Sequence, residues 1–283
     1  MNERFPGAHH GSLFHAPHAF AFAFILFLAG WPSTGFAASL KFVPMSILLD
    51  SEPRRGALTI MNDGEEKVTV QLQLVKWTQD AQGRDLYEPS KDLVFYPQIL
   101  SIEAGKEGTV RVGDDRQGSV AVEKSYRLFV QELPVRKPGE KVVRIALRVG
   151  IPVFIAPKDP RPALSFQDAR VADGRLQVTF RNSGNAHSTI QKINLAGLDA
   201  AGREVFSKEI GGWYVLAGVS RAFPVDVSPA DCQALKVLKI QGTAGSVLAT
   251  GQFNIDAASC AQLAAGAAQG KLDVEKLLPP SKP

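Results

Sequence analysis

Few side chains in this sequence are of the types that catalyse reactions or bind metals. Four of the five histidines, His9, His10, His15 and His18, precede residue 38, so His187 is the only imidazole of residues 38–283. A catalytic triad, a cysteine–histidine pair or a multi-histidine metal site would each depend on that one residue. It follows a turn-like run at 182–186, where a solvated loop residue is the expectation.

Paired carboxylates could support hydrolysis, with one group acting as acid and the other as base or nucleophile. The adjacent acidic pairs are Asp114 with Asp115 and Glu65 with Glu66, and both lie in turn-like contexts where solvated charge is expected. The sequence also lacks the GxxxxGK[ST] motif of a phosphate-binding loop. We therefore expect neither an enzyme nor a cofactor.

Cys232 and Cys260 are the only cysteines in the chain. In an exported protein an even number of cysteines favours a disulfide, and two free buried thiols are the alternative. The spacing fits neither a CxxC redox centre nor a zinc site.

Residues 1–37 have the organisation of a secretory signal peptide. Arg4 lies in the amino-terminal region that carries positive charge in signal peptides, and Ala19–Trp31 forms the apolar region. Gly35 and Ala37 occupy the small-residue positions of a cleavage site. The apolar run is shorter than the roughly 20 residues that span a bilayer, and no longer run follows. We expect an exported protein without membrane insertion. The net charge of +4, from 32 basic and 28 acidic residues, is too even to favour nucleic acid as a partner.

Period-two alternation of apolar residues dominates residues 38–155. The turn Asn62-Asp63-Gly64 between two such runs is a hairpin signal. Strands are predicted at 40–49, 56–61, 67–77, 93–100, 109–112, 126–133 and 142–155. This pattern is typical of an immunoglobulin-like β-sandwich.

A second β-rich run follows a short proline-rich segment. Residues 156–162 (APKDPRP) form the predicted linker or elbow, because three prolines stiffen it and stop a strand. Residues 163–260 are predicted to form a second β-sandwich, and residues 261–283 a mobile tail. The expected fold class is therefore all-β, with two immunoglobulin-like sandwiches.

The strand predicted at 142–155 (VVRIALRVGIPVFI) organises the rest of the interpretation. Its apolar residues alternate with Arg144, Arg148 and Pro152, which places the apolar side chains on one face. Proline has no N–H for a ladder and is tolerated at a sheet edge or strand end. An edge strand with an apolar face can accept another chain, whereas an inner strand of an ordinary β core is the alternative.

Several motifs in order resemble those of the periplasmic chaperones of the chaperone/usher pilus-assembly pathway. These motifs are ALTIMN at 57–62, YRL at 126–128, ELP at 132–134, IAL at 145–147 and IPVF at 151–154. The phrases YRL…ELP and IPVF are most similar to the archaic or alternative branch, and the resemblance covers most of residues 40–255.

The resemblance implies a chaperone that donates a strand to pilin subunits and delivers them to an outer-membrane usher. The residues inserted into the pilin would be Val143, Ile145, Leu147 and Val149. Strand addition of this kind needs no bond cleavage. The free protein could cover its own edge by forming a homodimer.

The familiar anchor for the pilin carboxylate, an arginine and a lysine, corresponds here to Ser46 and Pro152. Arg127 is the replacement candidate because guanidinium binds carboxylate through two hydrogen bonds; a solvated or locally paired arginine is the alternative. The resemblance also gives Glu132 an interdomain role, with Lys158 or Arg161 as partner, against a plain surface glutamate.

Two alternatives from other classes stay open. The chain could be an exported structural sandwich, such as a pilus subunit or adhesin, although both of its domains have full sets of strands. It could also be a carbohydrate-binding module.

Overall fold

The computed structural model describes residues 40–50, 53–116, 118–134, 146–172 and 174–265. Contacts divide the chain after residue 37, and every described element belongs to the unit formed by residues 38–283. The predicted signal peptide, residues 1–37, lies outside the described residues. Within the described ranges, no helix has the length and hydropathy needed to cross a bilayer.

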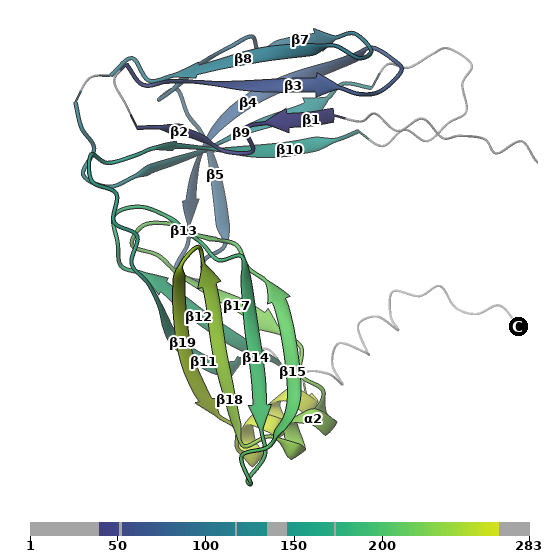
Figure 1. The fold of residues 1–283 in the computed structure, drawn as a ribbon, viewed down its shortest axis with the longest axis vertical. Helices are drawn as coiled ribbons and strands as arrows, with labels where there is room; N and C mark the ends of the chain where they lie inside the picture. The colour runs from purple at the N-terminus through teal and green to yellow at the C-terminus, as the bar shows by residue number, and fades with distance from the viewer. Residues whose placement is uncertain (1–39, 51–52, 117, 135–145, 173, 266–283) are drawn as a thin grey trace, which may run out of the picture. The chain divides into compact units, whose positions relative to one another are not determined.

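The first sandwich has two facing sheets (Figure 1). One sheet has the order β1-β3-β8-β6, and the other has the order β2-β10-β9-β4-β5, with β7 also paired to β4. The bounds are β1 Leu40–Val43, β2 Ile47–Leu49, β3 Arg55–Asn62, β4 Val68–Gln79, β5 Asp85–Pro89, β6 Val94–Tyr96, β7 Ile99–Ile102, β8 Glu107–Gly113, β9 Lys124–Glu132 and β10 Arg148–Ile155.

Alternation builds the core between these sheets. In β4, Val70, Leu72 and Leu74 are buried while the intervening Gln71 and Gln73 are exposed. A period-two strand places every second side chain on one face, so the apolar set enters the core together. One contiguous apolar cluster from both sheets fills the first sandwich.

The second sandwich has its own apolar cluster. Its sheets have the orders β11-β12-β17, β13-β16 and β15-β14-β18-β19. The bounds are β11 Leu164–Ala172, β12 Arg175–Asn182, β13 Ser188–Thr189, β14 Lys192–Leu198, β15 Glu204–Gly211, β16 Tyr214–Val215, β17 Ser220–Val225, β18 Val237–Ala244 and β19 Val247–Asn254. The predicted fold class, two immunoglobulin-like sandwiches, is confirmed; the domain and linker bounds stay predictions.

Helical segments close the second sandwich. The short helix α2, Pro229–Ala234, is capped by Ser228 and carries Cys232, which forms the predicted disulfide with Cys260. Cys260 lies in a helical segment at 257–265 that also buries Leu263 against the core. The predicted mobile tail from residue 261 is therefore wrong for 261–265, because Leu263 supplies core packing that the small neighbouring residues concealed. Residues 266–283 lie outside the described residues.

A buried asparagine organises one turn in each sandwich. Asn62 Nδ2 donates to Glu66 O and Ile102 O, and its Oδ1 accepts from Gly64 N. Asn182 Nδ2 donates to two buried carbonyls, and its Oδ1 accepts from two backbone N–H groups. The N-x-G sequence thus marks the same device in both sandwiches, since the short amide can satisfy the backbone groups that a tight turn leaves unpaired.

Replacing Asn182 with alanine should lower the free energy of unfolding by about 2–4 kcal/mol, because several buried backbone groups lose their partners. Urea denaturation followed by circular dichroism measures this change. Asp63→Ala is the control, since Asp63 pairs with exposed Lys41 and such pairs contribute about 0–1 kcal/mol. A loss for Asn182→Ala no larger than that of the control would contradict the role of the asparagine.

Candidate functional site

Strand β10 is paired unequally on its two edges. It pairs with β9 along its whole length, from Arg148 to Ile155. On the other edge β2 pairs in parallel with Val153, Phe154 and Ile155 alone. Among the described residues, the segment 148–152 therefore has no ladder partner on that edge. Unpaired backbone groups of this kind are a template for strand addition.

The apolar face of β10 leaves the protein's own core as the strand is followed toward its beginning. Ile151, Val153 and Ile155 are fully buried in the core of the first sandwich. Val149 is half-buried and packs against the same core, whereas Leu147 is 37% exposed. Of the side chains predicted to enter a pilin, Val149 thus still contacts the core of the first sandwich, whereas Leu147 is exposed to solvent.

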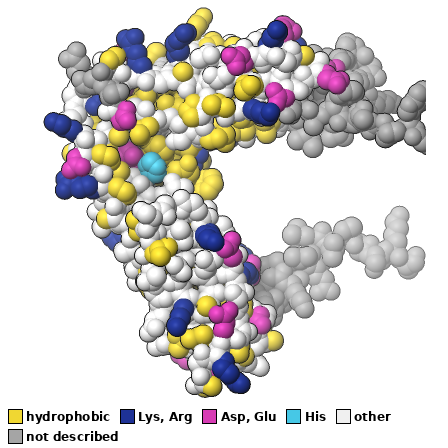
Figure 2. Space-filling model, viewed as in Figure 1, with side chains coloured by type: hydrophobic (Ala, Val, Ile, Leu, Met, Phe, Trp, Pro, Cys, Tyr) yellow, Lys and Arg dark blue, Asp and Glu magenta, His cyan; other side chains and the backbone are white. Residues whose placement is uncertain are grey.

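Two of the predicted strand residues are not covered by the structure. Val143 and Ile145 lie outside the described residues. Apolar side chains gather along the side of the first sandwich where β9, β10 and β5 lie in Figure 1 (Figure 2). Exposed Leu147, Leu86 and Tyr87 belong to these strands or border them. The binding roles of all four aliphatic residues stay predictions.

Arg127 is a buried cation on the outer face of the same sheet. It lies opposite Pro152 in the β9–β10 ladder and is only 5% exposed. Its Nη1 donates to Gly150 O at 2.9 Å, while Nε and Nη2 have no hydrogen-bond partner among the described residues. Burial lowers the pKa of Arg127, and the neighbouring Tyr87, followed by Tyr214 and Asp85, acts in the opposite direction.

Aromatic rings from both sandwiches surround this guanidinium. The Arg127 carbon Cζ lies 3.9 Å from the centroid of Trp77, in β4. It lies 5.4 Å from Trp213 and 5.3 Å from Tyr214, which belong to the second sandwich. Ring faces attract a cation electrostatically, so the cage partly offsets the loss of water. Neither alternative considered for Arg127, solvation or a direct local acid partner, describes this arrangement.

Gly150 makes room for the ring of Phe129 next to the Arg127 side chain. A Cβ at this position would lie 2.9 Å from Phe129 Cε1 and 3.6 Å from Arg127 Cδ. Phe129 in turn stacks with exposed Arg148, whose Cζ lies 3.9 Å from the ring centroid. The missing side chain thus lets two cations and an aromatic ring share one face of the sheet.

The remaining predicted residues have local contacts. Glu132 Oε2 accepts from Leu147 N at 3.4 Å, and Glu132 N donates to Leu147 O. This contact fixes the start of the candidate edge strand; the interdomain role of Glu132 stays a prediction. The structure pairs Arg161 with Asp159, and Ser46 lies in the bend before β2.

Contacts between the sandwiches use residues that the sequence did not single out. Asp85, at the start of β5, accepts from Trp213 Nε1 at 2.8 Å and from Arg221 Nη1 at 3.2 Å. Gln79 donates to Tyr214 O and accepts from Leu216 N. Residues 80–85 are a polar stretch of the sequence. The turn-like run from Asp80 to Gly83 was the available signal for a hairpin that leads into β5.

His187 also makes contacts between the sandwiches. The prediction that it is a solvated loop residue is wrong. Its Nδ1 lies 2.8 Å from Glu123 Oε1, which also accepts from His187 N at 3.0 Å. The imidazole stacks on Phe154 with 3.9 Å between ring centroids. It therefore ties the second sandwich to β10 and to the residue before β9. Within the described ranges, no group of three potential ligands could hold a metal ion.

The prediction that the adjacent acidic residues Asp114 and Asp115 are solvated is also wrong for Asp114. The Asp114 side chain is 2% exposed and pairs with Arg54, which is itself buried. Arg116 donates to the same carboxylate from Nε at 2.8 Å. Burial alone would raise the pKa of Asp114, but the hydrogen bonds from Arg116 and Arg54 outweigh it and lower the pKa below its ordinary value. This ion pair orders the segment that leads to Glu123.

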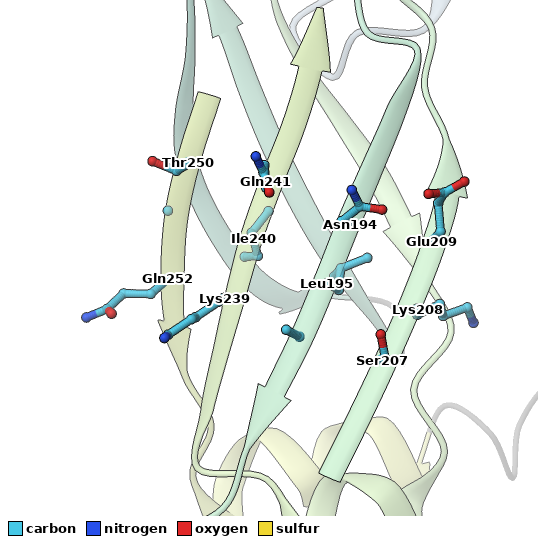
Figure 3. Close-up of a pocket in the computed structure, with 12 residues that line it drawn as sticks. Asn194, Leu195, Ser207, Lys208, Glu209, Lys239, Ile240, Gln241, Thr250 and Gln252 are labelled. Carbon is cyan, nitrogen blue, oxygen red and sulfur yellow. The ribbon is translucent and has the colours of Figure 1, made fainter. Parts of the chain in front are cut away.

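A hollow of ≈ 720 Å³ lies over the sheet β15-β14-β18-β19 of the second sandwich. Side chains such as Asn194, Glu209 and Gln241 reach it from neighbouring strands (Figure 3). None of its lining residues is aromatic, so it offers no ring on which a sugar could stack. The hollow does not support the carbohydrate-binding alternative.

Comparisons with known proteins agree with this geometry. Residues 39–160 match the family described as pili and flagellar-assembly chaperone, PapD N-terminal domain. A solved archaic chaperone–usher complex from Acinetobacter baumannii, between the chaperone CsuC and the tip adhesion subunit CsuE, is similar with a TM-score of 0.55 and 22% identity. The match covers 76% of this chain and 98% of that chain.

The chaperone YadV is similar at a TM-score of 0.50 and 12% identity, covering 76% of this chain and 98% of that chain. No curated protein sequence matches this one. At these identities the solved structures establish the fold alone.

This chain shares with those solved chaperones a fold of two sandwiches, and here the strand at the end of the first sandwich is half covered. Residues 39–160 of the chain are therefore similar to the PapD N-terminal domain of pili and flagellar-assembly chaperones.

Acid should remove the contribution of Asp114 to stability. Because its pKa is lowered in the folded state, the contribution is present above about pH 4, the ordinary value, and is lost as the pH falls through the folded value. Asp114→Asn should lower the free energy of unfolding by about 3–5 kcal/mol at pH 7, because Arg54 loses its buried partner. The difference from wild type should shrink below pH 4 in urea denaturation. Exposed Asp115→Asn is the control, and a difference that does not depend on pH would contradict the assignment.

Proposed function

We propose that this chain is a periplasmic chaperone that captures pilin subunits by donating the start of strand β10 and delivers them to an outer-membrane usher. The observation that carries the proposal is the open edge at 148–152 of a strand that is otherwise paired. A strand in this state can complete another sandwich, which is the established mode of chaperone–pilin complementation.

The side chains of the strand would supply the driving force. Leu147 is exposed, and Val143 and Ile145 precede it in the sequence with the same alternation, so we propose that all three belong to the donated face. Burying each in a pilin groove would contribute about 1.5–3 kcal/mol before ordering costs. Val149, half-buried against the chaperone's own core, would stand at the boundary between the two cores.

Arg127 is the proposed anchor for the pilin's terminal carboxylate. Its unpaired Nε and Nη2 are suited to a bidentate carboxylate, and a buried charge gains most from such a partner. Arg127 lies directly across the β9–β10 ladder from Pro152, so one strand separates it from the open edge. A peptide carboxylate there would satisfy both the orphaned donors and the buried charge.

The match at residues 39–160 and the solved relatives support the proposed partners and compartment. The CsuC complex is described as a chaperone–tip adhesion subunit pre-assembly complex, which supports a pilin or adhesin subunit as the partner of this chain. The signal-like residues 1–37 support export to the periplasm. A fold-completing role needs no catalysis, and the resemblance to the archaic or alternative branch suits the missing arginine–lysine anchor.

Introducing a charge on the donated face should abolish capture. Leu147→Asp or Ile145→Asp should weaken complex formation at least about 100-fold, because an apolar contact is lost and a carboxylate is buried. The measurement is co-purification with a co-expressed candidate pilin, together with thermal denaturation of the free variant. Arg148→Asp, on the alternate face, is the control. An unfolded Leu147→Asp variant would instead indicate an ordinary core strand, and equal survival of the pilin without the chaperone would refute the proposed function.

Removing the anchor should weaken capture without removing the apolar contacts. Arg127→Ala should lower pilin affinity by about 10–100-fold, the range expected for a charge-assisted hydrogen bond. Arg144→Ala and Arg148→Ala are matched controls from the alternate face of the donated strand. Surface binding assays with the purified pilin measure the difference. Equal losses for the three arginine variants would exclude Arg127 as the anchor.

A further inference from the structure

One carboxylate links the two indole rings that face Arg127. Asp85 Oδ1 accepts from Trp77 Nε1 at 3.0 Å, and Asp85 Oδ2 accepts from Trp213 Nε1 at 2.8 Å. Trp77 belongs to β4 of the first sandwich, whereas Trp213 directly precedes β16 of the second. Asp85 therefore fixes the orientation of one ring from each sandwich at once.

The same carboxylate is fully engaged by other donors. Gln79 Nε2 donates to Oδ1 at 2.9 Å, and Arg221 Nη1 donates to it at 3.2 Å. The Asp85 side chain is 16% exposed, so these bonds act where water competes little. No hydrogen bond joins Asp85 to Arg127 among the described residues, which leaves the guanidinium donors available.

We propose that Asp85 is a positioning residue for the Arg127 site: it holds Trp77 and Trp213 over the guanidinium, so that recognition of a peptide carboxylate depends on both sandwiches. This inference rests on the proposed function, in which Arg127 receives the pilin carboxylate. The rings restrict the guanidinium to one orientation and exclude water from its faces, which strengthens a charge-assisted bond made in its plane.

The first measurement tests whether Asp85 holds the indole rings of Trp77 and Trp213 in place. The chain has three tryptophans, Trp31, Trp77 and Trp213, so tryptophan labelled with nitrogen-15 gives few indole N–H signals in NMR spectra of the full chain. Trp77→Phe and Trp213→Phe assign the two signals of interest. Asp85→Asn should shift both and speed their hydrogen exchange. Asp80→Asn is the matched control, because Asp80 lies in the same hairpin, pairs with exposed Arg84 and retains its turn-capping oxygen as asparagine.

The second measurement tests recognition of a peptide carboxylate. The probes are two synthetic peptides of alternating valine and threonine, identical except that one ends in a free carboxylate and the other in a carboxamide. Wild type should prefer the free carboxylate, and Arg127→Ala should lose that preference. Asp85→Asn should reduce the preference by about tenfold, as expected when a binding group is misplaced, with little change in carboxamide binding. Asp85→Glu, which keeps the charge, should restore part of it.

The outcomes separate the inference from the proposed function. If Asp85→Asn shifts both indole signals but leaves the carboxylate preference intact, Asp85 is structural and the positioning role is refuted. If Asp85→Asn shifts the Trp77 signal alone, Asp85 does not orient one ring from each sandwich, and the inference is refuted. If wild type shows no carboxylate preference, or Arg127→Ala retains it, the anchor in the proposed function fails and the inference fails with it.

Discussion

The half-covered state of β10 is the constraint on which the rest of the structure depends. The strand gives Ile151, Val153 and Ile155 to its own core and is held there by β9 and β2. The ladder with β2 stops at Val153, so the preceding residues keep one free edge. Pro152 removes one donor from the strand. A strand that was fully paired would stabilise the first sandwich more but would have no backbone edge to share with a partner.

The buried guanidinium of Arg127 is the second constraint, because a charge without water needs compensation. A carboxylate in direct contact would provide it but would also occupy the donors. The structure instead surrounds Arg127 with ring faces and places Asp85 behind two of the rings. Cation–π attraction of about 0.5–2 kcal/mol per ring compensates only in part. The remaining cost is the physical reason for proposing that Arg127 binds an external anion.

Much of the fold follows from local sequence patterns. Alternation in segments such as 67–77 predicts the strands, the N-x-G runs at Asn62 and Asn182 predict turns, and the cysteine pair predicts the disulfide. The junction could not be predicted in the same way. Asp85, Glu123 and His187 acquire their roles from residues distant in sequence, as in the contact of Asp85 with Trp213, and such pairings have no periodic signature. Leu263 was missed for a similar reason, since one apolar residue among alanines shows no pattern.

The junction also gives the second sandwich a role in the proposed function, in which the first sandwich donates a single strand. Phe154 of β10 stacks with His187, and Arg127 of β9 lies against Trp213 and Tyr214. Strand β10, which carries the open edge, and its neighbour β9 are thus both held from their outer face by side chains of the second sandwich. An edge strand without such support could twist or change register, since register is weakly specified where one side is unpaired. In the proposed function, the second sandwich backs the donated strand and completes the environment of the proposed anchor, Arg127.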